Sequence, residues 1–192
     1  MAKLRAGLRR CTQNALTTSS ALAAATLGAE AAQGEVCAAA NDNGGGQVVV
    51  SGAKAAVERA VELAKARGAK RAMLLPVSAP FHCALMQPAA DAMAAALKTV
   101  TVKAPAVPVV ANVLAQPISE PAAIVDSLVR QVTATVRWRE SVAFMAGAGV
   151  TTFYELGAGK VLSGLVKRIA EGASATAIGT PDDVAAFRAA RA

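Results

Sequence analysis

Residues 35–77, EVCAAANDNGGGQVVVSGAKAAVERAVELAKARGAKRAMLLPV, carry the clearest structural pattern of the chain. EVCAAAN and QVVVSG predict two strands, and NDNGGG between them predicts a turn that glycines favour. KAAVERAVELAKARG has apolar residues at helical spacing and ends at Gly68, so it predicts a helix. KRAMLLPV predicts a further strand that ends at Pro76. This β-β-α-β order indicates most of a small antiparallel sheet with helices on one face.

Beyond Pro76, strand and helix patterns alternate to the end of the chain. Strands are predicted in VTVKAP, VPVVANV, TTFYELG and ATAIGT, with TTFYELG expected to be buried. Helices are predicted in ALMQPAADAMAAALK, SEPAAIVDSLVRQV, VRWRESVAFMAGAG, GKVLSGLVKRIAEG and PDDVAAFRAARA. In SEPAAIVDSLVRQV, Ser119 is the expected N-cap and Pro121 lies in the first turn. The alternation favours a parallel sheet covered by helices on both faces.

Composition is consistent with a protein that has a sizeable core. The chain has 192 residues, of which 54% are hydrophobic, and only 3% are aromatic. Its apolar runs are too short to cross a bilayer. The basic start MAKLRAGLRR is not followed by the apolar region of a signal peptide, so we expect a cytoplasmic protein.

The formal net charge of +7 raises the possibility of nucleic-acid binding. However, the basic residues are scattered, and one Trp and one Tyr are few for base stacking. We therefore expect no nucleic-acid partner. A basic surface would equally attract the phosphates of a nucleotide-like molecule or an acidic carrier protein.

The thiols and the imidazole do not form a pattern typical of a metal site. Cys11, Cys37 and Cys83 are widely spaced, and His82 is the single histidine of the chain. With no Cys-x-x-Cys pair, neither a disulfide framework nor a zinc site is predicted. We expect reduced thiols with structural roles.

Two loops follow predicted strands, where active sites of α/β proteins gather. PVSAPFH contains His82, and ELGAGK contains Gly157-Ala158-Gly159-Lys160. A lone histidine is more often structural than catalytic, and the glycine spacing fits neither known phosphate-loop motif, so a tight turn is the simpler interpretation. The two loops are expected to share one crevice.

Five stretches taken in order are more specific than either loop. They are Asn41-Asp42-Asn43 with QVVVSG, LPVSAPFHCALMQPAA, VPVVANV, LVRQV with VRWRESV, and YELGAGKVLSGLVKRI. Together they closely resemble the malonyl-CoA:acyl carrier protein transacylases of bacterial fatty-acid synthesis, from about Ala31 to Ala192.

This resemblance implies an α/β fold in which an incomplete α/β-hydrolase-like parallel-sheet domain carries a small ferredoxin-like α+β subdomain. We expect a poorly defined segment at residues 1–20, a shortened ferredoxin-like subdomain at 21–77, and the C-terminal part of the acyltransferase domain at 78–192. The implied reaction transfers malonyl from coenzyme A to acyl carrier protein through a serine ester. Malonyl-CoA is then a substrate and acyl carrier protein a partner, and neither a cofactor nor a metal is expected.

The resemblance also assigns site residues. His82 matches the histidine that takes the proton of the nucleophilic serine. Gln131 matches the residue whose backbone carbonyl orients that imidazole, a role that a carboxylate has in many triads. Asn41 and Asn43 match polar positions near the acyl pocket, so they are expected to contact the substrate.

The nucleophile itself is absent from this sequence. None of the nine serines has Gly two places before and after it, as the Gly-x-Ser-x-Gly elbow of the family requires. The family's early Gly-Gln-Gly loop is also missing. We therefore expect a truncated chain that is inactive alone, and the alternative is a catalytically silent remnant that binds acyl carrier protein or coenzyme A.

Further departures concern the N-terminal part. LRRCTQ places leucine where the family's carboxylate-binding arginine would align, and Arg9 is off by one, so that role is assigned to no residue. ALAAATLG resembles the first strand of the subdomain, yet five residues separate Gly28 from Gly34, which predicts that a helix has been lost. Cys83 is not expected to replace the serine, because adjacent residues seldom align for proton transfer.

Overall fold

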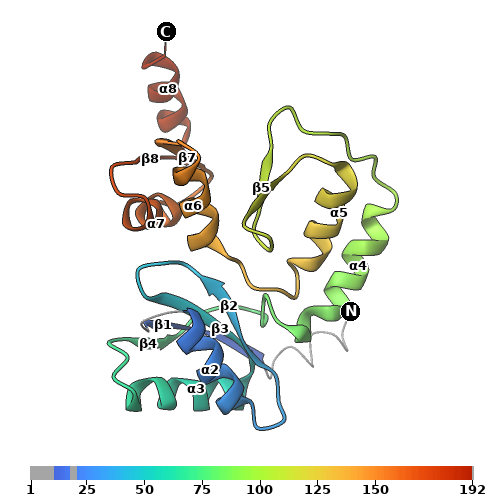
Figure 1. Cartoon of the computed structure of the whole chain (residues 1–192), viewed down its shortest axis with the longest axis vertical. Coiled ribbons are helices and arrows are strands. Elements are labelled where there is room, and N and C mark those ends of the chain that lie inside the picture. The colour runs from blue at the N-terminus through green and yellow to red at the C-terminus, as the bar shows by residue number, and fades with distance from the viewer. Residues whose placement is uncertain (1–10, 18–20, 192) are drawn as a thin grey trace. The chain divides into compact units, whose positions relative to one another are not determined.

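The computed structural model describes residues 11–17 and 21–191 (Figure 1). The chain divides into two compact units between Trp138 and Arg139. The predicted fold class, α/β with a ferredoxin-like part, is confirmed.

The first unit contains a four-stranded sheet with two helices. Its elements in chain order are β1 (Cys11–Thr17), α2 (Ala21–Ala32), β2 (Cys37–Asp42), β3 (Gln47–Ala53), α3 (Lys54–Ala66) and β4 (Ala72–Leu74). The strand order is β2-β3-β1-β4, and all neighbouring strands are antiparallel. This β-α-β-β-α-β arrangement is the ferredoxin-like topology. The β-β-α-β prediction for residues 35–77 is confirmed and forms its second part.

Helices α2 and α3 pack on one face of this sheet (Figure 1). The core between them is built from small and β-branched side chains, because the Ala-rich helices come close to the sheet. Its fully or nearly fully buried members are Ala24, Leu27, Ala31, Val48, Val50, Val57, Ala60 and Ala64. The helical spacing predicted from Ala56 to Ala64 is therefore the buried face of α3.

The prediction that ALAAATLG is a strand and that a helix has been lost is wrong. This segment lies in α2, and the first strand of the sheet is CTQNALT in β1. Alanine and leucine have high helix propensity, which agrees with the observed helix. The segment CTQNALT shows no strand pattern, and it is a strand because it pairs with both β3 and β4.

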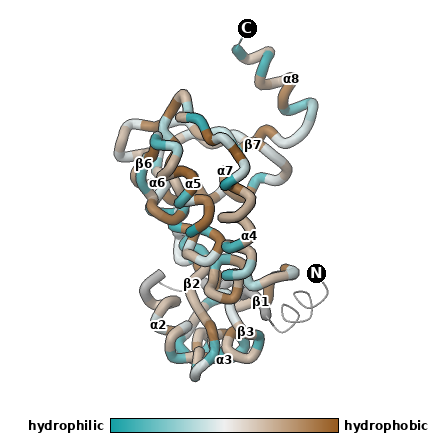
Figure 2. The backbone as a smooth tube through the Cα atoms, turned by 90° about the vertical axis from the view of Figure 1, so that its right-hand side faces the viewer, coloured by the Kyte–Doolittle hydropathy of each residue, from teal (hydrophilic) through white to brown (hydrophobic). Residues whose placement is uncertain are grey.

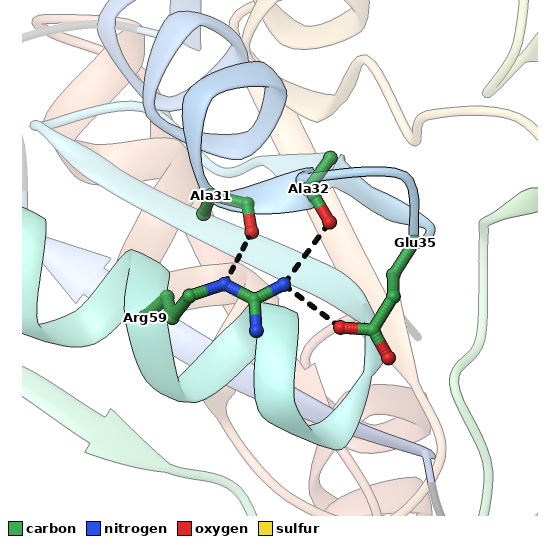
Figure 3. A network of polar contacts seen from close by, with 4 residues as sticks. All are labelled: Ala31, Ala32, Glu35 and Arg59. Atoms are coloured by element: carbon green, nitrogen blue, oxygen red, sulfur yellow. Dashed lines mark hydrogen bonds and ion pairs between the residues drawn. The ribbon is translucent and has the colours of Figure 1, made fainter.

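Arg59 joins α3 to the end of α2 (Figure 3). Its Nε donates to the carbonyl oxygen of Ala31 at 2.8 Å, and Nη2 donates to that of Ala32 at 3.0 Å. The same Nη2 forms an ion pair with Glu35 at 2.8 Å. The last carbonyls of a helix lack partners within the helix, so Arg59 satisfies two of them.

We expect Arg59→Met to lower the free energy of unfolding by about 1–3 kcal/mol, because hydrogen bonds from a charged group are lost while the apolar stem is kept. The matched control is Arg67→Met. Arg67 reaches α2 only through an exposed ion pair with Glu30, so its loss should cost less than about 1 kcal/mol. Urea denaturation of the full chain measures both, and equal effects would contradict the role assigned to Arg59.

The rest of the first unit contains two helices and a short hairpin. After a 3₁₀ turn at Ala84–Met86 come α4 (Gln87–Leu97), β5 (Val109–Ala111), β6 (Gln116–Ile118) and α5 (Pro121–Arg130). Helices α4 and α5 pack side by side, and β5 pairs with β6 in antiparallel fashion.

Three details of the sequence prediction for this part are wrong. VTVKAP forms no strand, since Pro105 ends it and no partner strand pairs with it. The strand at Gln116–Ile118 was not predicted, because its pattern is too short to recognise. The N-cap of α5 is Glu120 rather than Ser119, and it makes no side-chain cap.

The second unit contains α6 (Trp138–Gly147), which begins at the boundary, followed by β7 (Thr152–Leu156), α7 (Val161–Ile169), β8 (Ser174–Ile178) and α8 (Pro181–Ala189). Strands β7 and β8 are parallel and joined through α7. This β-α-β unit confirms the predicted alternation, but among the described residues it is the full extent of the parallel sheet. TTFYELG is not the buried strand that was predicted, since Tyr154 and Leu156 are 41% and 78% exposed.

Polar side chains define the starts of α7 and α8. Glu155 accepts hydrogen bonds from the backbone N–H of Leu162 and from the N–H and hydroxyl of Ser163, at 2.7–3.1 Å. The Ser163 hydroxyl, more than any other group, lowers the pKa of the Glu155 carboxyl. Thr180 and Asp183 form a capping box at α8. Helix α8 alternates hydrophilic and hydrophobic segments along its length (Figure 2).

Candidate active site

His82 lies in the loop between β4 and α4, in a backbone conformation that L-residues rarely adopt. Its φ is 61°, in the left-handed region. For a residue other than glycine this costs about 1–2 kcal/mol, so neighbouring contacts must hold it. The side chains of Pro80 and Cys83 on either side are fully buried, and the Cys83 thiol donates to the Pro80 carbonyl oxygen at 3.2 Å. The loop is thus anchored around a half-buried imidazole.

The imidazole is oriented by the backbone of Gln131. His82 Nδ1 lies 2.8 Å from the Gln131 carbonyl oxygen. Because a carbonyl oxygen only accepts, Nδ1 must carry the hydrogen in this contact. In the neutral ring the other nitrogen, Nε2, then has no hydrogen and is free to accept a proton. This is the tautomer that a general base needs.

Gln131 can offer its carbonyl because α5 ends there. It is the C-cap residue, and its own N–H donates to the Ser127 carbonyl oxygen at 3.0 Å. The last carbonyls of a helix point beyond its end and carry the negative end of the helix dipole. The imidazole therefore faces a partial negative charge rather than a carboxylate.

The loop that begins at Gln131 contacts β2, the strand that contains Asn41. The backbone of Val136 bonds with Ala40 and Asp42 at 2.8 and 2.9 Å, which makes a parallel bridge opposite Asn41. Just before it, the Thr135 hydroxyl donates to the Ala39 carbonyl oxygen at 2.6 Å. The four-stranded sheet is thereby joined to the segment that orients His82.

Asn43 directly follows the last residue of β2, at the start of the turn to β3. Its N–H donates to the Gln47 carbonyl oxygen at 3.0 Å, and the buried Asp42 carboxylate accepts from the Gly44 N–H at 3.3 Å. Asn41 and Asn43 are both half-buried. The loop at residues 131–137 thus joins the His82–Gln131 contact at one end to the strand of the two asparagines at the other.

Sequence reasoning missed Asn112 and Arg137. Asn112 Nδ2 donates to Gln131 Oε1 at 3.2 Å, and Arg137 donates through Nη1 to the Leu114 carbonyl oxygen at 3.0 Å. Both residues lie in stretches already recognised, VPVVANV and VRWRESV. No signal in one sequence distinguishes their polar side chains from ordinary surface residues.

Cys83 is buried, as predicted, with 1% of its surface exposed. Burial raises the pKa of its thiol. Within residues 11–17 and 21–191, no three His, Cys, Asp or Glu side chains gather into a possible metal site. In the same described part of the chain, no helix has the length and hydropathy to cross a membrane.

The ELGAGK loop is a tight turn between β7 and α7, with Gly157 and Gly159 at φ of 126° and 102°. It belongs to the second unit and His82 to the first, so a shared crevice stays a prediction. A hollow of about 940 Å³ lies along α3 and β4, and one of about 550 Å³ lies along α4 and α5. Neither hollow is lined by His82 or Gln131.

The family of the acyl transferase domain matches residues 2–190, and this chain belongs to that family. Arg9, to which no role is assigned, lies in the match but outside the described residues.

The similar curated proteins are malonyl CoA-acyl carrier protein transacylases. Malonyl CoA-acyl carrier protein transacylase of Salmonella typhimurium strain LT2 is 53% identical over 152 residues, 79% of this chain and 49% of the relative. That of Escherichia coli strain K12 is 52% identical over 157 residues, 82% and 51% of the two chains. The chain therefore spans about half the length of the curated relatives that it matches.

Solved structures of malonyltransferases are also similar to this chain. The acyl-carrier-protein-S-malonyltransferase from Bartonella henselae superposes with a TM-score of 0.89 and 46% identity, over 99% of this chain and 63% of the other. A second solved structure is 40% identical and superposes with a TM-score of 0.89, over 97% of this chain and 62% of the other. It is a malonyl-transacylase in complex with its type II PKS acyl-carrier protein.

Proposed function

We propose that this chain supplies the general base of a malonyl-CoA:acyl carrier protein transacylase, with His82 as the base and Gln131 as its orienting residue. The observation that carries the proposal is the 2.8 Å contact between His82 Nδ1 and the Gln131 carbonyl oxygen. It leaves Nε2 as the proton acceptor. The relatives named as transacylases support the substrate class.

The reaction needs a serine hydroxyl, which a Gly-x-Ser-x-Gly segment outside this sequence would present. His82 Nε2 takes the hydroxyl proton as the serine oxygen attacks the malonyl thioester. The carbon–sulfur bond breaks, and the imidazolium gives the proton to the departing sulfur, so coenzyme A leaves as the thiol and His82 is neutral again. In the second half, the carrier protein thiol gives its proton to His82 and attacks the serine ester. The proton then returns to the serine oxygen.

The end of α5 contributes to this chemistry electrostatically. Positive charge develops on the imidazole while it holds the proton. The negative end of the α5 dipole and the Gln131 carbonyl oxygen both face that charge, and such helix-end interactions contribute about 0.3–2 kcal/mol. A backbone carbonyl at a helix end thus serves where other triads use a carboxylate.

Asn41 and Asn43 would contact the acyl group. Their place near the acyl pocket is supported by the joint between β2 and the 131–137 loop, which fixes the asparagine-bearing strand relative to Gln131. Amide side chains offer both donors and acceptors, which suits a malonyl carboxylate and a thioester carbonyl.

Exposed apolar side chains support a further polypeptide segment packing on the second unit. Leu156 and Val161 are 78% and 69% exposed, and both flank the ELGAGK turn. A contiguous exposed apolar patch marks a surface that another segment can cover, whereas single exposed apolar residues are ordinary. A segment carrying the nucleophilic serine is the occupant that the proposal requires.

The proposal is tested by completing the chain. The front half of the Salmonella relative, which this chain does not match, is fused ahead of it, and malonyl transfer from coenzyme A to acyl carrier protein is measured. We expect transfer by the fusion and none by the same fusion with the elbow serine changed to alanine. A folded fusion without transfer would contradict the proposal. The named relatives are transacylases, so the silent binding module is not favoured.

A further inference from the structure

Asn112 makes two polar contacts with the loop that orients His82. Its side-chain Nδ2 donates to Gln131 Oε1 at 3.2 Å, and its backbone carbonyl oxygen accepts from the Arg137 N–H at 3.0 Å. Gln131 follows the last residue of α5, and Arg137 precedes the first residue of α6. One residue therefore holds both ends of the seven-residue loop 131–137.

Asn112 is itself fixed by the β5–β6 hairpin. It follows β5 directly, and the Ala111 carbonyl oxygen accepts from the N–H groups of Leu114 and Ala115 at 3.1 and 2.8 Å. Ala111 and Ala115 are buried. The backbone of Asn112 thus has a defined position that does not depend on the loop.

The Gln131 carbonyl needs such a support. Because α5 ends at this residue, the peptide that follows is no longer held by a continuing helix. The next two N–H groups, of Val132 and Thr133, make backbone contacts of 3.2 and 3.3 Å, which are longer than the usual helix bond. The side-chain hydrogen bond from Asn112 to Gln131 adds a further point at which this residue is held.

We propose that Asn112 is a positioning residue, which acts through the Gln131 side chain to aim the Gln131 carbonyl oxygen at His82 Nδ1. Its importance for catalysis rests on the proposed function. Its effect on the imidazole tautomer rests on the geometry of this chain alone. The hydrogen bonds run from Asn112 to Gln131 and from His82 to Gln131, so the proposed effect passes through Gln131.

The single histidine makes a direct test possible. In the ¹⁵N-labelled 192-residue chain, the imidazole resonances belong to His82 without further assignment. Long-range ¹H–¹⁵N spectra at alkaline pH, where imidazole rings are neutral, report which nitrogen carries the hydrogen. We expect the Nδ1–H tautomer to predominate. Asn112→Ala should lower the ratio of Nδ1–H to Nε2–H by about two- to tenfold, the effect of one ordinary hydrogen bond.

Companion variants separate this effect from general loosening. Gln131→Ala should shift the ratio as Asn112→Ala does, and the double variant should add nothing, because both remove one bond. Gln131→Glu keeps the acceptor oxygen and should retain the original ratio. The control Gln87→Ala removes a comparable amide hydrogen bond, to Asp91 on the surface of α4, and should leave the spectrum unchanged.

An unchanged ratio in folded Asn112→Ala would overturn the proposal, as would additive effects in the double variant. If Asn112→Ala does not fold, the comparison of Gln131→Ala with Gln131→Glu decides, and equal ratios for the two would overturn it. Loss of the proposed transacylase function leaves this result intact, since the tautomer is measured without substrate. Conversely, an unchanged tautomer ratio in Asn112→Ala would overturn the role of Asn112 but not the proposed transacylase function, which the completed fusion tests.

Discussion

His82→Ala lowers malonyl transfer by about 10²–10⁴-fold in the chain completed with a serine-bearing front segment, because a positioned general base contributes that much to rate. The imidazole is half-buried and its Nδ1 contact is with one backbone carbonyl, so alanine leaves a small gap and no unpaired charge. The fold should therefore persist. Initial rates of malonyl transfer, measured beside circular dichroism of the same samples, check both statements.

Two variants serve as comparisons for His82→Ala. Gln131→Ala retains the carbonyl that accepts from Nδ1 and loses only the side-chain contact with Asn112, so we expect a decrease of about two- to tenfold. Cys83→Ala should have almost no effect on transfer, because its thiol is buried and donates to a backbone carbonyl. Full activity of His82→Ala, or loss of activity in folded Cys83→Ala, would show that the general base has been assigned wrongly.

The 192-residue chain by itself gains no covalent malonyl group when it is incubated with malonyl-CoA. An acyl-enzyme needs an activated nucleophile, and no serine of this sequence lies in a Gly-x-Ser-x-Gly elbow. Intact-mass spectrometry should therefore show a single species of unchanged mass, whereas the completed chain should gain the mass of one malonyl group. The completed chain with its elbow serine replaced is the matched control.

The thiols of the described side chains are poor substitutes for that serine. Burial raises the pKa of Cys37 to about 11 and also raises that of Cys83, so both thiols stay protonated at neutral pH. The thiolate is the nucleophilic form, and these environments disfavour it. A malonyl adduct that maps to Cys83 after digestion, and disappears in Cys83→Ala, would contradict this expectation.

Local patterns were sufficient for the elements that combine strong propensity with clear ends. QVVVSG has a run of β-branched residues and lies in strand β3, and KAAVERAVELAKARG has helical spacing and contains α3. Gly68, with a φ of 80°, follows the end of that helix. The parallel β7–β8 pair followed from the alternation of strands and helices. Where a pattern repeats over more than ten residues, it is rarely overridden.

Patterns failed where a segment depends on its partners. CTQNALT has no strand signature and is a strand because β3 and β4 lie on either side of it. VTVKAP has the composition of a strand but no neighbour to pair with. Strand formation depends on cross-strand contacts, which one sequence does not specify.

The sequence by itself indicated four residues of the candidate site and the chemistry that they allow, but not Asn112 or Arg137. His82 is the single imidazole, the Gly-x-Ser-x-Gly motif is absent, and family resemblance marked Gln131, Asn41 and Asn43. Only the tertiary structure decided how they are joined. Because α5 ends at Gln131, its carbonyl is free to receive Nδ1 of His82, and Asn112 holds the loop that carries it to β2. These contacts link residues 19 to 96 positions apart, and chain folding rather than local preference brings such residues together.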